Sequence, residues 1–405
     1  MNKKIIILLT VLIDVLGIGI IVPVLPFYVE SFGASDFTVT LLFAVFSFFS
    51  FFSAPLLGSL SDKIGRRPVL IASIASTAFG WLVFASAINI YWLFIGRIID
   101  GLAAGNFPIA QSYLIDIAKD DKEKTANLGL IGAVFGVGFI IGPLLGGVLS
   151  QISIATPFWF VGGLAIFNAI LAYFKLPETN VSKDKNKKVS FSPFAPIVKA
   201  IKNNNLRFSF IAWFLFGLAI AGQQSILSLY LAKAFSFNSF LISLVLGGTG
   251  VILVINQGVL LKKLWLKYVS EEKLIIYSIV FLGISFIFTG IHFILPLIIG
   301  LFLFSVTHSI LRVSMTSKIA REGAQNEQGM ILGVMSSIMS LSMIIGPILA
   351  GALFTIDLSL PLWGSAIFSF LAFLIIISEN RKKIKIKTLD EQSLEITEQK
   401  IELAR

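Results

Sequence analysis

The chain has 405 residues, of which 56% are hydrophobic and only 13% are charged. A soluble domain is about one-quarter charged, so this composition indicates an integral membrane protein without a separate soluble domain. The net charge of +10 does not indicate nucleic-acid binding, because most Lys and Arg residues lie in short loops and at the chain ends, and the lack of Cys excludes disulfides and thiolate metal sites.

Apolar stretches of about 20 residues recur along the chain, and each is long enough to cross a bilayer once. The first follows the basic opening MNKK and reaches about Tyr28, which is too long for a cleaved signal peptide, so we expect an uncleaved first span. The sequence predicts an all-α integral membrane protein with twelve transmembrane helices, at approximately 5–28, 39–60, 69–88, 91–115, 126–149, 157–175, 208–231, 239–261, 274–291, 294–316, 328–353 and 361–378.

The charges between these spans predict how the chain is oriented. Most Lys and Arg residues lie in alternate breaks, at 61–68, 116–125, 176–207, 262–273 and 317–327. Four breaks on the other side contain no Lys or Arg, namely 29–38, 89–90, 150–156 and 354–360. By the positive-inside rule we expect both termini in the cytoplasm and the protein in the plasma membrane, which is the inner membrane of a bacterium.

A repeated pattern predicts two halves of six helices each. The hexapeptide GPLLGG, from Gly142 to Gly147, returns as GPILAG in the eleventh span. The one long internal linker is basic, with lysines at Lys183, Lys185, Lys187 and Lys188. We therefore expect an N-terminal bundle, a cytoplasmic linker, a C-terminal bundle and a charged cytoplasmic tail at 1–175, 176–207, 208–378 and 379–405. Such repeats are typical of transporters that rock one bundle against the other.

The segment from Gly58 to Pro68, GSLSDKIGRRP, is the most charged part of the first hundred residues. It resembles the loop between helices 2 and 3 of the major facilitator superfamily, whose fold has two pseudo-symmetric six-helix bundles. The residues on the family pattern include Gly58, Asp62, Gly65, Arg66 and Arg67. The resemblance implies a cytoplasmic gate, in which Asp62 caps the N-terminal end of the eleventh helix while Arg66 and Arg67 anchor cytoplasmic groups. Alternatively the loop only orients the chain, which leaves Gly58 and Asp62 unexplained.

Glycines recur through the fifth predicted span, together with one proline: Gly132, Gly136, Gly138, Gly142, Pro143, Gly146 and Gly147. Fourfold spacing places glycines on one helix face, where the lack of side chains lets another helix approach closely. A packing stripe is therefore one interpretation. The GPxxGG ending also resembles the antiporter signature of the drug:proton antiporters, and this resemblance favours efflux over uptake.

Two acidic residues lie inside predicted spans. Asp14 is roughly 15 Å into the first helix at 1.5 Å per residue, and Asp100 lies at a similar distance from the other face on the fourth helix. Such a residue costs about 2.5 to 3.5 kcal/mol on insertion scales, so it is typically functional. Each is a candidate proton carrier that loads and releases a proton as the site changes sides.

Arg97 lies three residues before Asp100 on the same helix face, so the two side chains are expected to pair. The pair is either structural or, as the resemblance of GRIIDGLAAG to helix 4 of the family implies, part of proton transfer. No basic residue lies within two turns of Asp14 on its own helix. The stretch around it, LIDVLGIGIIVPVLP, resembles the first helix of the tetracycline:proton antiporters.

Polar residues in other spans are candidates for lining a substrate cavity: Gln111, Gln223, Gln224 and Asn256. For Gln223 and Gln224, hydrogen bonds between helices are an equal alternative. The two histidines, His292 and His308, lack metal-ligand spacing, so we expect no metal and no cofactor. The sequence has no recognisable catalytic dyad and no GxxxxGK[ST] loop. An enzyme and an ATP-driven pump are therefore not expected.

These patterns together predict a proton-coupled exporter of lipophilic drugs that works by alternating access as a monomer. Its expected partners are a small lipophilic substrate, protons and the lipid bilayer, but not nucleic acid. The predicted spans between 208 and 353 contain no Asp or Glu, unlike many tetracycline antiporters, so Asp14 and Asp100 would carry the proton coupling. The alternative is a sugar or small-metabolite transporter of the same superfamily, although few polar residues lie in the spans.

Overall fold

The computed structural model describes residues 3–180, 193–194, 197–198, 206–322 and 328–379. Most of the predicted linker, including all six of its lysines, and the predicted tail after Glu379 lie outside these residues. The described chain contains twelve helical segments that are long and apolar enough to cross a membrane. The predicted fold class is confirmed, and each predicted span overlaps one of these segments.

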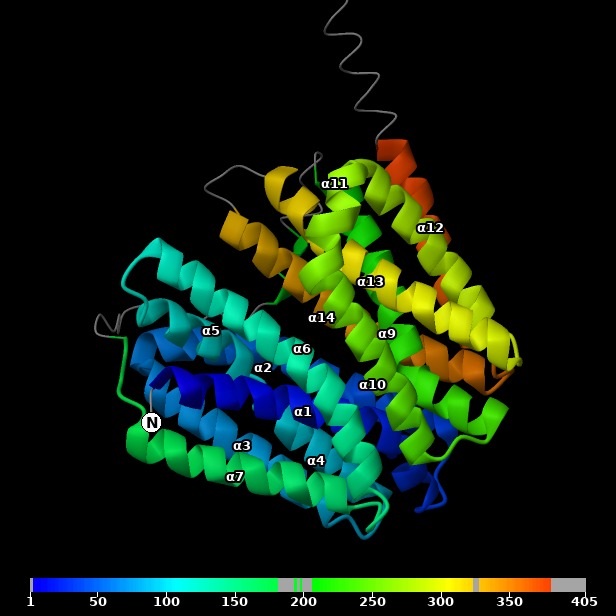
Figure 1. Ribbon diagram of the computed structural model, residues 1–405. Coiled ribbons are helices and arrows are strands. Elements are labelled where there is room, and N and C mark those ends of the chain that lie inside the picture. Colours follow the sequence, from blue (N-terminus) through cyan, green and yellow to red (C-terminus); the bar gives the residue numbers. More distant parts are fainter. Residues whose placement is uncertain (1–2, 181–192, 195–196, 199–205, 323–327, 380–405) are drawn as a thin grey trace, which may run out of the picture.

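The first half of the protein contains six spans, which are blue to green in Figure 1. They are α1 (Lys3–Glu30), α2 (Asp36–Ile64), α3 (Arg66–Ala85), the pair α4 (Ile90–Leu102) and α5 (Asn106–Asp116), α6 (Asp121–Leu149) and α7 (Thr156–Lys175). The chain reverses between α2 and α3 at the single residue Gly65, whose φ of 118° lies where a side chain would be strained.

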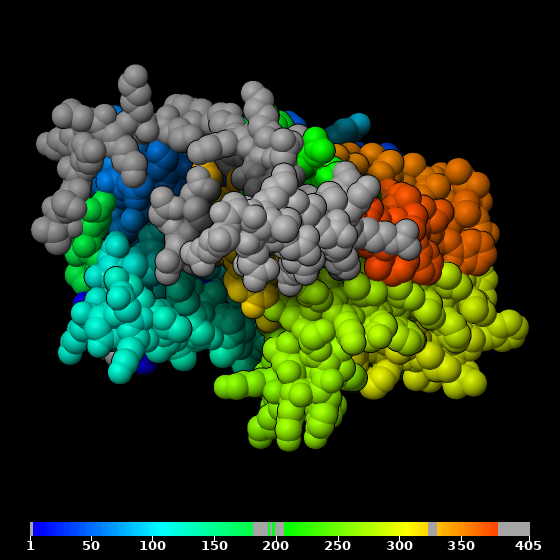
Figure 2. Space-filling view, turned by 90° about the horizontal axis from the view of Figure 1, so that it is seen from above, coloured from blue at the N-terminus to red at the C-terminus, as the bar shows by residue number. Residues whose placement is uncertain are grey.

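The second half continues the pattern with six more spans, which lie beside the first half in Figure 2. They are α9 (Arg207–Phe235), α10 (Ser239–Ile255) with η1 (Asn256–Trp265) and α11 (Leu266–Tyr268), α12 (Glu271–Thr289), α13 (Ile294–Glu322), α14 (Gln328–Phe354) and a last helix at Leu360–Glu379. The segment η1 is a π-helix, a rare form that is often found near functional sites.

The fourth span is broken, whereas the sequence predicts one continuous helix. After α4, the amides of Ala103 and Ala104 bond to carbonyls three residues back, which tightens the chain before α5 begins. Gly101 and Gly105, on either side of this break, allow α2 to approach closely. A Cβ at Gly101 would lie 2.8 Å from the carbonyl oxygen of Phe46, and one at Gly105 would lie 2.6 Å from Cβ of Leu57. The break places the next residue, Asn106, at the start of α5.

The two halves share a hydrophobic core near one membrane face only. We call the face that holds the start of α1 the amino-terminal face, and the other the opposite face. Near the opposite face one buried cluster joins both halves, with Leu25 and Leu42 from the first and Leu231 and Phe354 from the second. Toward the amino-terminal face, one cluster holds only first-half residues, and another belongs to the second half and the linker apart from Phe51 of α2. The halves are therefore joined at the opposite face.

The seam between the halves is closed by small residues. The Oγ atoms of Ser150 on α6 and Ser239 on α10 are 2.9 Å apart. A Cβ at Gly250 of α10 would lie 3.0 Å from the carbonyl oxygen of Phe139 on α6. One ion pair also crosses the seam, between Lys233 and Asp36, at 3.5 Å. Close contact of this kind holds two helices together without large interlocking side chains.

The glycines of α6 face two different helices. Toward α1, a Cβ at Gly142 would lie 2.9 Å from Cα of Gly19, and Gly146 is packed in the same way against Ile20. Toward α10, a Cβ at Gly136 would lie 3.0 Å from Val254. Gly147 also faces α10, whereas a Cβ at Gly132 would meet no atom within 4 Å. One face therefore packs inside the first half and the other packs across the seam, and Gly132 belongs to neither.

The two environments predict opposite effects of adding one methyl group to α6. Gly142→Ala should lower the stability of the purified protein by roughly 1–3 kcal/mol, because the new Cβ overlaps the backbone of α1. Gly132→Ala should leave stability unchanged or raise it by up to about 1 kcal/mol, because Ala is the better helix former. Thermal unfolding in detergent measures both, and equal midpoints for the two variants would contradict this packing.

Candidate proton and substrate site

The fourth span carries a buried ion pair, as the sequence spacing predicts. Nη1 of Arg97 lies 3.5 Å from Oδ2 of Asp100, and the two residues are only 5% and 7% exposed. The guanidinium also stacks over the rings of Trp81 and Phe84, at 4.4 and 4.8 Å from their centroids. Aromatic faces attract a cation most strongly where water is excluded, so Arg97 is held both by its carboxylate and by the aromatic wall of α3.

Asp14 is connected to this ion pair through two polar side chains. Its Oδ1 accepts a hydrogen bond from Nδ2 of Asn106 at 3.1 Å, and the same nitrogen donates to Oγ1 of Thr77 at 3.1 Å. Thr77 in turn is hydrogen-bonded to the carboxylate of Asp100. Side chains from α1, α5, α3 and α4 thus form one polar chain through the first half. A change of charge at one end alters the hydrogen bonds along all of it.

The two carboxylates differ in their access to solvent. Asp100 is buried, whereas Asp14 is only partly buried although it lies about 16 Å along α1 from Lys3. Asp14 is therefore the more accessible of the two carboxylates.

Sequence analysis did not single out Asn106 or Thr77. Their role depends on the break between α4 and α5, which brings the start of α5 against α1 and α3. A signal was nevertheless present, because the glycine-rich GLAAG is followed directly by an amide residue inside an apolar span. Amides at such breaks are typical hydrogen-bonding groups between membrane helices.

The loop between α2 and α3 makes its described contacts with the first half and with the start of the segment that follows it. Arg66 pairs with Asp62 and with Asp116, whose Oδ2 lies 3.2 Å from Nε of Arg66. The backbone amides of Arg66 and Arg67 donate to the carboxylate of Glu178 at 2.9 and 3.3 Å. An acid at the start of α3 also neutralises the positive end of the helix dipole. Asp116 and Glu178 are site residues that sequence analysis missed.

The remaining predicted gate residues differ in their surroundings. Arg67 donates from Nη2 to the carbonyl oxygen of Tyr173 on α7, at 2.7 Å. A Cβ at Gly58 would meet no atom within 4 Å, so close packing does not require a glycine there. The expected cap of Asp62 on the eleventh helix concerns the chain before Gln328, and residues 323–327 lie outside the described residues.

The four candidate lining residues fall into two groups. Gln111 and Gln224 are partly exposed in mid-span, whereas Gln223 is buried. Asn256 is 1% exposed, and its amide donates to Oγ of Ser309 at 2.6 Å while its oxygen accepts from Nε1 of Trp265 at 2.8 Å. The hydrogen bonds of Asn256 therefore tie η1 to α13.

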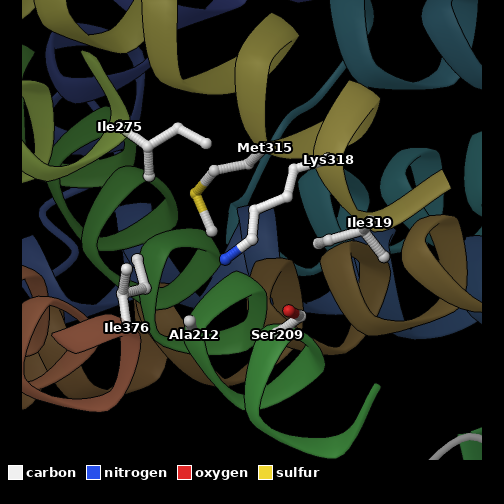
Figure 3. Close-up of a pocket in the computed structure, with 7 residues that line it drawn as sticks. All are labelled: Ser209, Ala212, Ile275, Met315, Lys318, Ile319 and Ile376. Carbon is white, nitrogen blue, oxygen red and sulfur yellow. The ribbon is translucent and has the colours of Figure 1, made fainter. Parts of the chain in front are cut away.

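A small pocket lies inside the second half, between α9, α12, α13 and the last helix (Figure 3). Its lining is mostly apolar: Ser209, Ala212, Ile275, Met315, Lys318, Ile319 and Ile376. The Lys318 ammonium points into it and pairs with Glu379 at 3.5 Å. This pocket lies within one half and away from Asp14. The described residues also contain no cluster of three or more potential metal ligands.

The buried pair predicts a non-additive effect on stability. Arg97→Met should lower the free energy of unfolding by about 3–5 kcal/mol, because Asp100 is left buried without its cation. Adding Asp100→Leu to the same protein should restore much of that loss. Thermal unfolding of the two single variants and the double variant measures the coupling, with the exposed Arg321→Met as the control. A double variant that shows the sum of the two single losses would contradict the pairing.

Comparisons with known proteins agree with this architecture. The family model described as Major Facilitator Superfamily matches residues 7–322 and 264–401. The chain is 30% identical over 361 residues to a tetracycline resistance protein, class H, of Pasteurella multocida, which covers 86% of this chain and 88% of that protein. It is 26% identical over 396 residues to the quinolone resistance protein NorA of Staphylococcus aureus strain MRSA252, which covers 96% of this chain and 100% of that protein.

A solved structure shows the same fold at low sequence identity. It is a bacterial homologue of the human lysosomal transporter Spinster, in an inward-facing and unoccupied conformation. The TM-score is 0.76 at 14% identity, and the match covers 95% of this chain and 97% of that one. With the family model matched over most of the sequence and twelve membrane-spanning segments in place, the chain belongs to the Major Facilitator Superfamily and is a multi-pass membrane transporter.

Proposed function

We propose that the protein exports lipophilic drugs across the plasma membrane in exchange for protons. The observation that carries this proposal is the connection of a partly exposed mid-span acid, Asp14, to the buried Arg97–Asp100 pair through Asn106 and Thr77. Ionisable groups inside a membrane protein are costly and mark ion or proton pathways. The tetracycline and quinolone resistance proteins among the relatives favour drugs as the substrate class.

The direction of transport follows from the charges of the loops. The amino-terminal face carries most of the Lys and Arg, so the positive-inside rule assigns it to the cytoplasm. The halves are joined at the opposite face, so the conformation is open toward the cytoplasm in this assignment. Within the seam at the opposite face, α6 and α10 meet through Ser and Gly contacts, which let the two helices approach closely.

Protonation of Asp14 would couple the entry of a proton to the export of a drug molecule. A proton that enters from outside binds Asp14, and the neutral carboxyl no longer attracts a cationic drug. After the halves rock, Asp14 is open to the cytoplasm and releases the proton, so its negative charge can bind the next drug molecule. The inside-negative membrane potential supplies about 2.3 kcal/mol per elementary charge per 100 mV. Asn106 and Thr77 would pass the change in charge from α1 to the ion pair on α4.

The surroundings of the seam support a lipophilic substrate rather than a sugar. Recognition of a sugar requires many hydrogen-bonding side chains, because each hydroxyl that loses water needs a new partner. Besides Asp14, the predicted polar residues that remain partly exposed in mid-span are Gln111 and Gln224. The sugar or metabolite transporter is therefore the weaker of the two functions.

Substrate-induced proton release tests the proposed function. In energised everted vesicles that contain the wild-type protein, tetracycline or ethidium should cause proton release, and sugars such as glucose should not. Asp14→Asn should abolish the drug-induced signal, because the carboxyl that exchanges the proton is lost. Asp121→Asn is the matched control, since this side chain is 94% exposed and pairs only with Lys124 in the described structure. No release with any drug, or release that persists in Asp14→Asn, would overturn the proposal.

A further inference from the structure

We propose that the second half supplies an anion-binding subsite at Arg312, so that the preferred substrates are flat apolar molecules that carry a carboxylate. This rests on the proposed function, because it names the substrate class of the same transport site. The two halves would then recognise opposite charges, with Asp14 on one side of the seam and Arg312 on the other.

Arg312 is a cation of α13 whose charge is not balanced in the described structure. It is exposed, and no described side chain forms an ion pair or hydrogen bond with its guanidinium. The contact that involves it is made by its backbone carbonyl, which accepts from Oγ1 of Thr316 at 2.6 Å. The next two cations of the same helix, Lys318 and Arg321, each pair with a glutamate. Arg312 is therefore free to bind a ligand.

The neighbours of Arg312 show where it points. At 100° per residue, Arg312 lies about 40° from His308 and about 60° from Ser309 on the helix face. His308 contacts the ring of Phe216 on α9, and Ser309 accepts from the amide of Asn256 on η1. Arg312 therefore points between α9 and η1. The side of α13 around Ile310 packs against Leu274 of α12 and against Leu261 of η1.

Arg312 and Asp14 lie at the same depth. Arg312 is ten residues before the end of α13, or about 15 Å, and Asp14 is about 16 Å from the start of α1. Both helix ends are at the amino-terminal face. A guanidinium turned toward lipid at this depth is costly, so Arg312 is better accommodated toward the seam between the halves. Opposite charges at one level suit a zwitterionic or anionic amphiphile.

An aromatic wall next to Arg312 provides the apolar part of the subsite. The ring of His308, one turn before Arg312, stacks on Phe304 with centroids 5.2 Å apart and also lies 6.0 Å from Phe216. Nδ1 of His308 is buried and has no hydrogen-bond partner in the described structure. A planar guanidinium binds a carboxylate in a two-point geometry, and flat rings pack on aromatic faces. This combination fits an aromatic ring system with a carboxylate at its edge.

A matched pair of dyes tests the subsite. Rhodamine B has a free carboxylate, and its ethyl ester has the same ring system without the negative charge. Binding to the purified full-length protein in lipid nanodiscs can be measured by fluorescence anisotropy without any proton gradient. The variants are Arg312→Gln and Arg312→Lys, and the control is Arg321→Gln on the same helix. Size-exclusion chromatography confirms that each variant is folded.

Wild type should bind rhodamine B more tightly than the ester. Arg312→Gln should weaken rhodamine B binding roughly tenfold and leave ester binding unchanged, because a charge-assisted hydrogen bond is lost. Arg312→Lys should keep part of the preference, and Arg321→Gln should behave as wild type. Equal affinity of wild type for both dyes would overturn the proposal, as would an equal loss for both dyes in Arg312→Gln. If Arg312→Gln does not fold, the proposal is decided by the affinities of wild type and of Arg312→Lys for the two dyes.

The binding assay separates this proposal from the proposed function. If rhodamine B is preferred and the preference depends on Arg312, the subsite stands even when drugs cause no proton release in vesicles. If proton release occurs and depends on Asp14 but the two dyes bind alike, the exporter stands and the anion subsite fails.

Discussion

The structure of the first half depends on the cost of placing charge inside a membrane. Arg97 and Asp100 neutralise each other on one helix, and the aromatic rings of α3 surround the guanidinium. Asp14 has no cation of its own and instead shares a hydrogen-bonded chain with that pair through Asn106 and Thr77. Gly101 and Gly105 allow α2 to pack closely beside the break between α4 and α5. The break places Asn106 where it can donate hydrogen bonds to both Asp14 and Thr77.

The packing of α6 connects this polar centre to the movement of the halves. One face of α6 lies so close to α1 that only glycine fits at Gly142, and this fixes α1, with its Asp14, to α6. The other face meets α10 across the seam through small residues such as Gly147. A rotation of α6 would therefore carry Asp14 with it while the seam opens. This arrangement gives the protonation of one carboxyl a direct route to the contact between the halves.

Sequence analysis predicted the features that depend on the order and spacing of residues within a single helix. It predicted the twelve spans from hydropathy, the pairing of Arg97 with Asp100 from their spacing, and close packing of the α6 glycines. It did not predict contacts between distant helices, because one chain does not show which helices are neighbours. The role of Asn106 required the break in the fourth span, and that of Glu178 required α7 to end beside α3. The hydrogen bond of Asn256 to Ser309 was not predictable for the same reason, because it joins η1 to a helix about 50 residues further along the chain.

In the proposed transport cycle, the charge of Asp14 decides at which face the halves are closed. Because the chain has no Cys, spin labels can be placed at pairs of introduced cysteines without background. One pair, Lys122 and Lys267, spans the amino-terminal face, and the exposed residues Ile152 and Ile356 span the opposite face. Pulsed electron paramagnetic resonance should show that Asp14→Asn, which mimics the protonated carboxyl, lengthens the first distance and shortens the second, because the protonated protein turns toward the cytoplasm. Unchanged distances in both pairs would contradict a role of the Asp14 charge in closing either face.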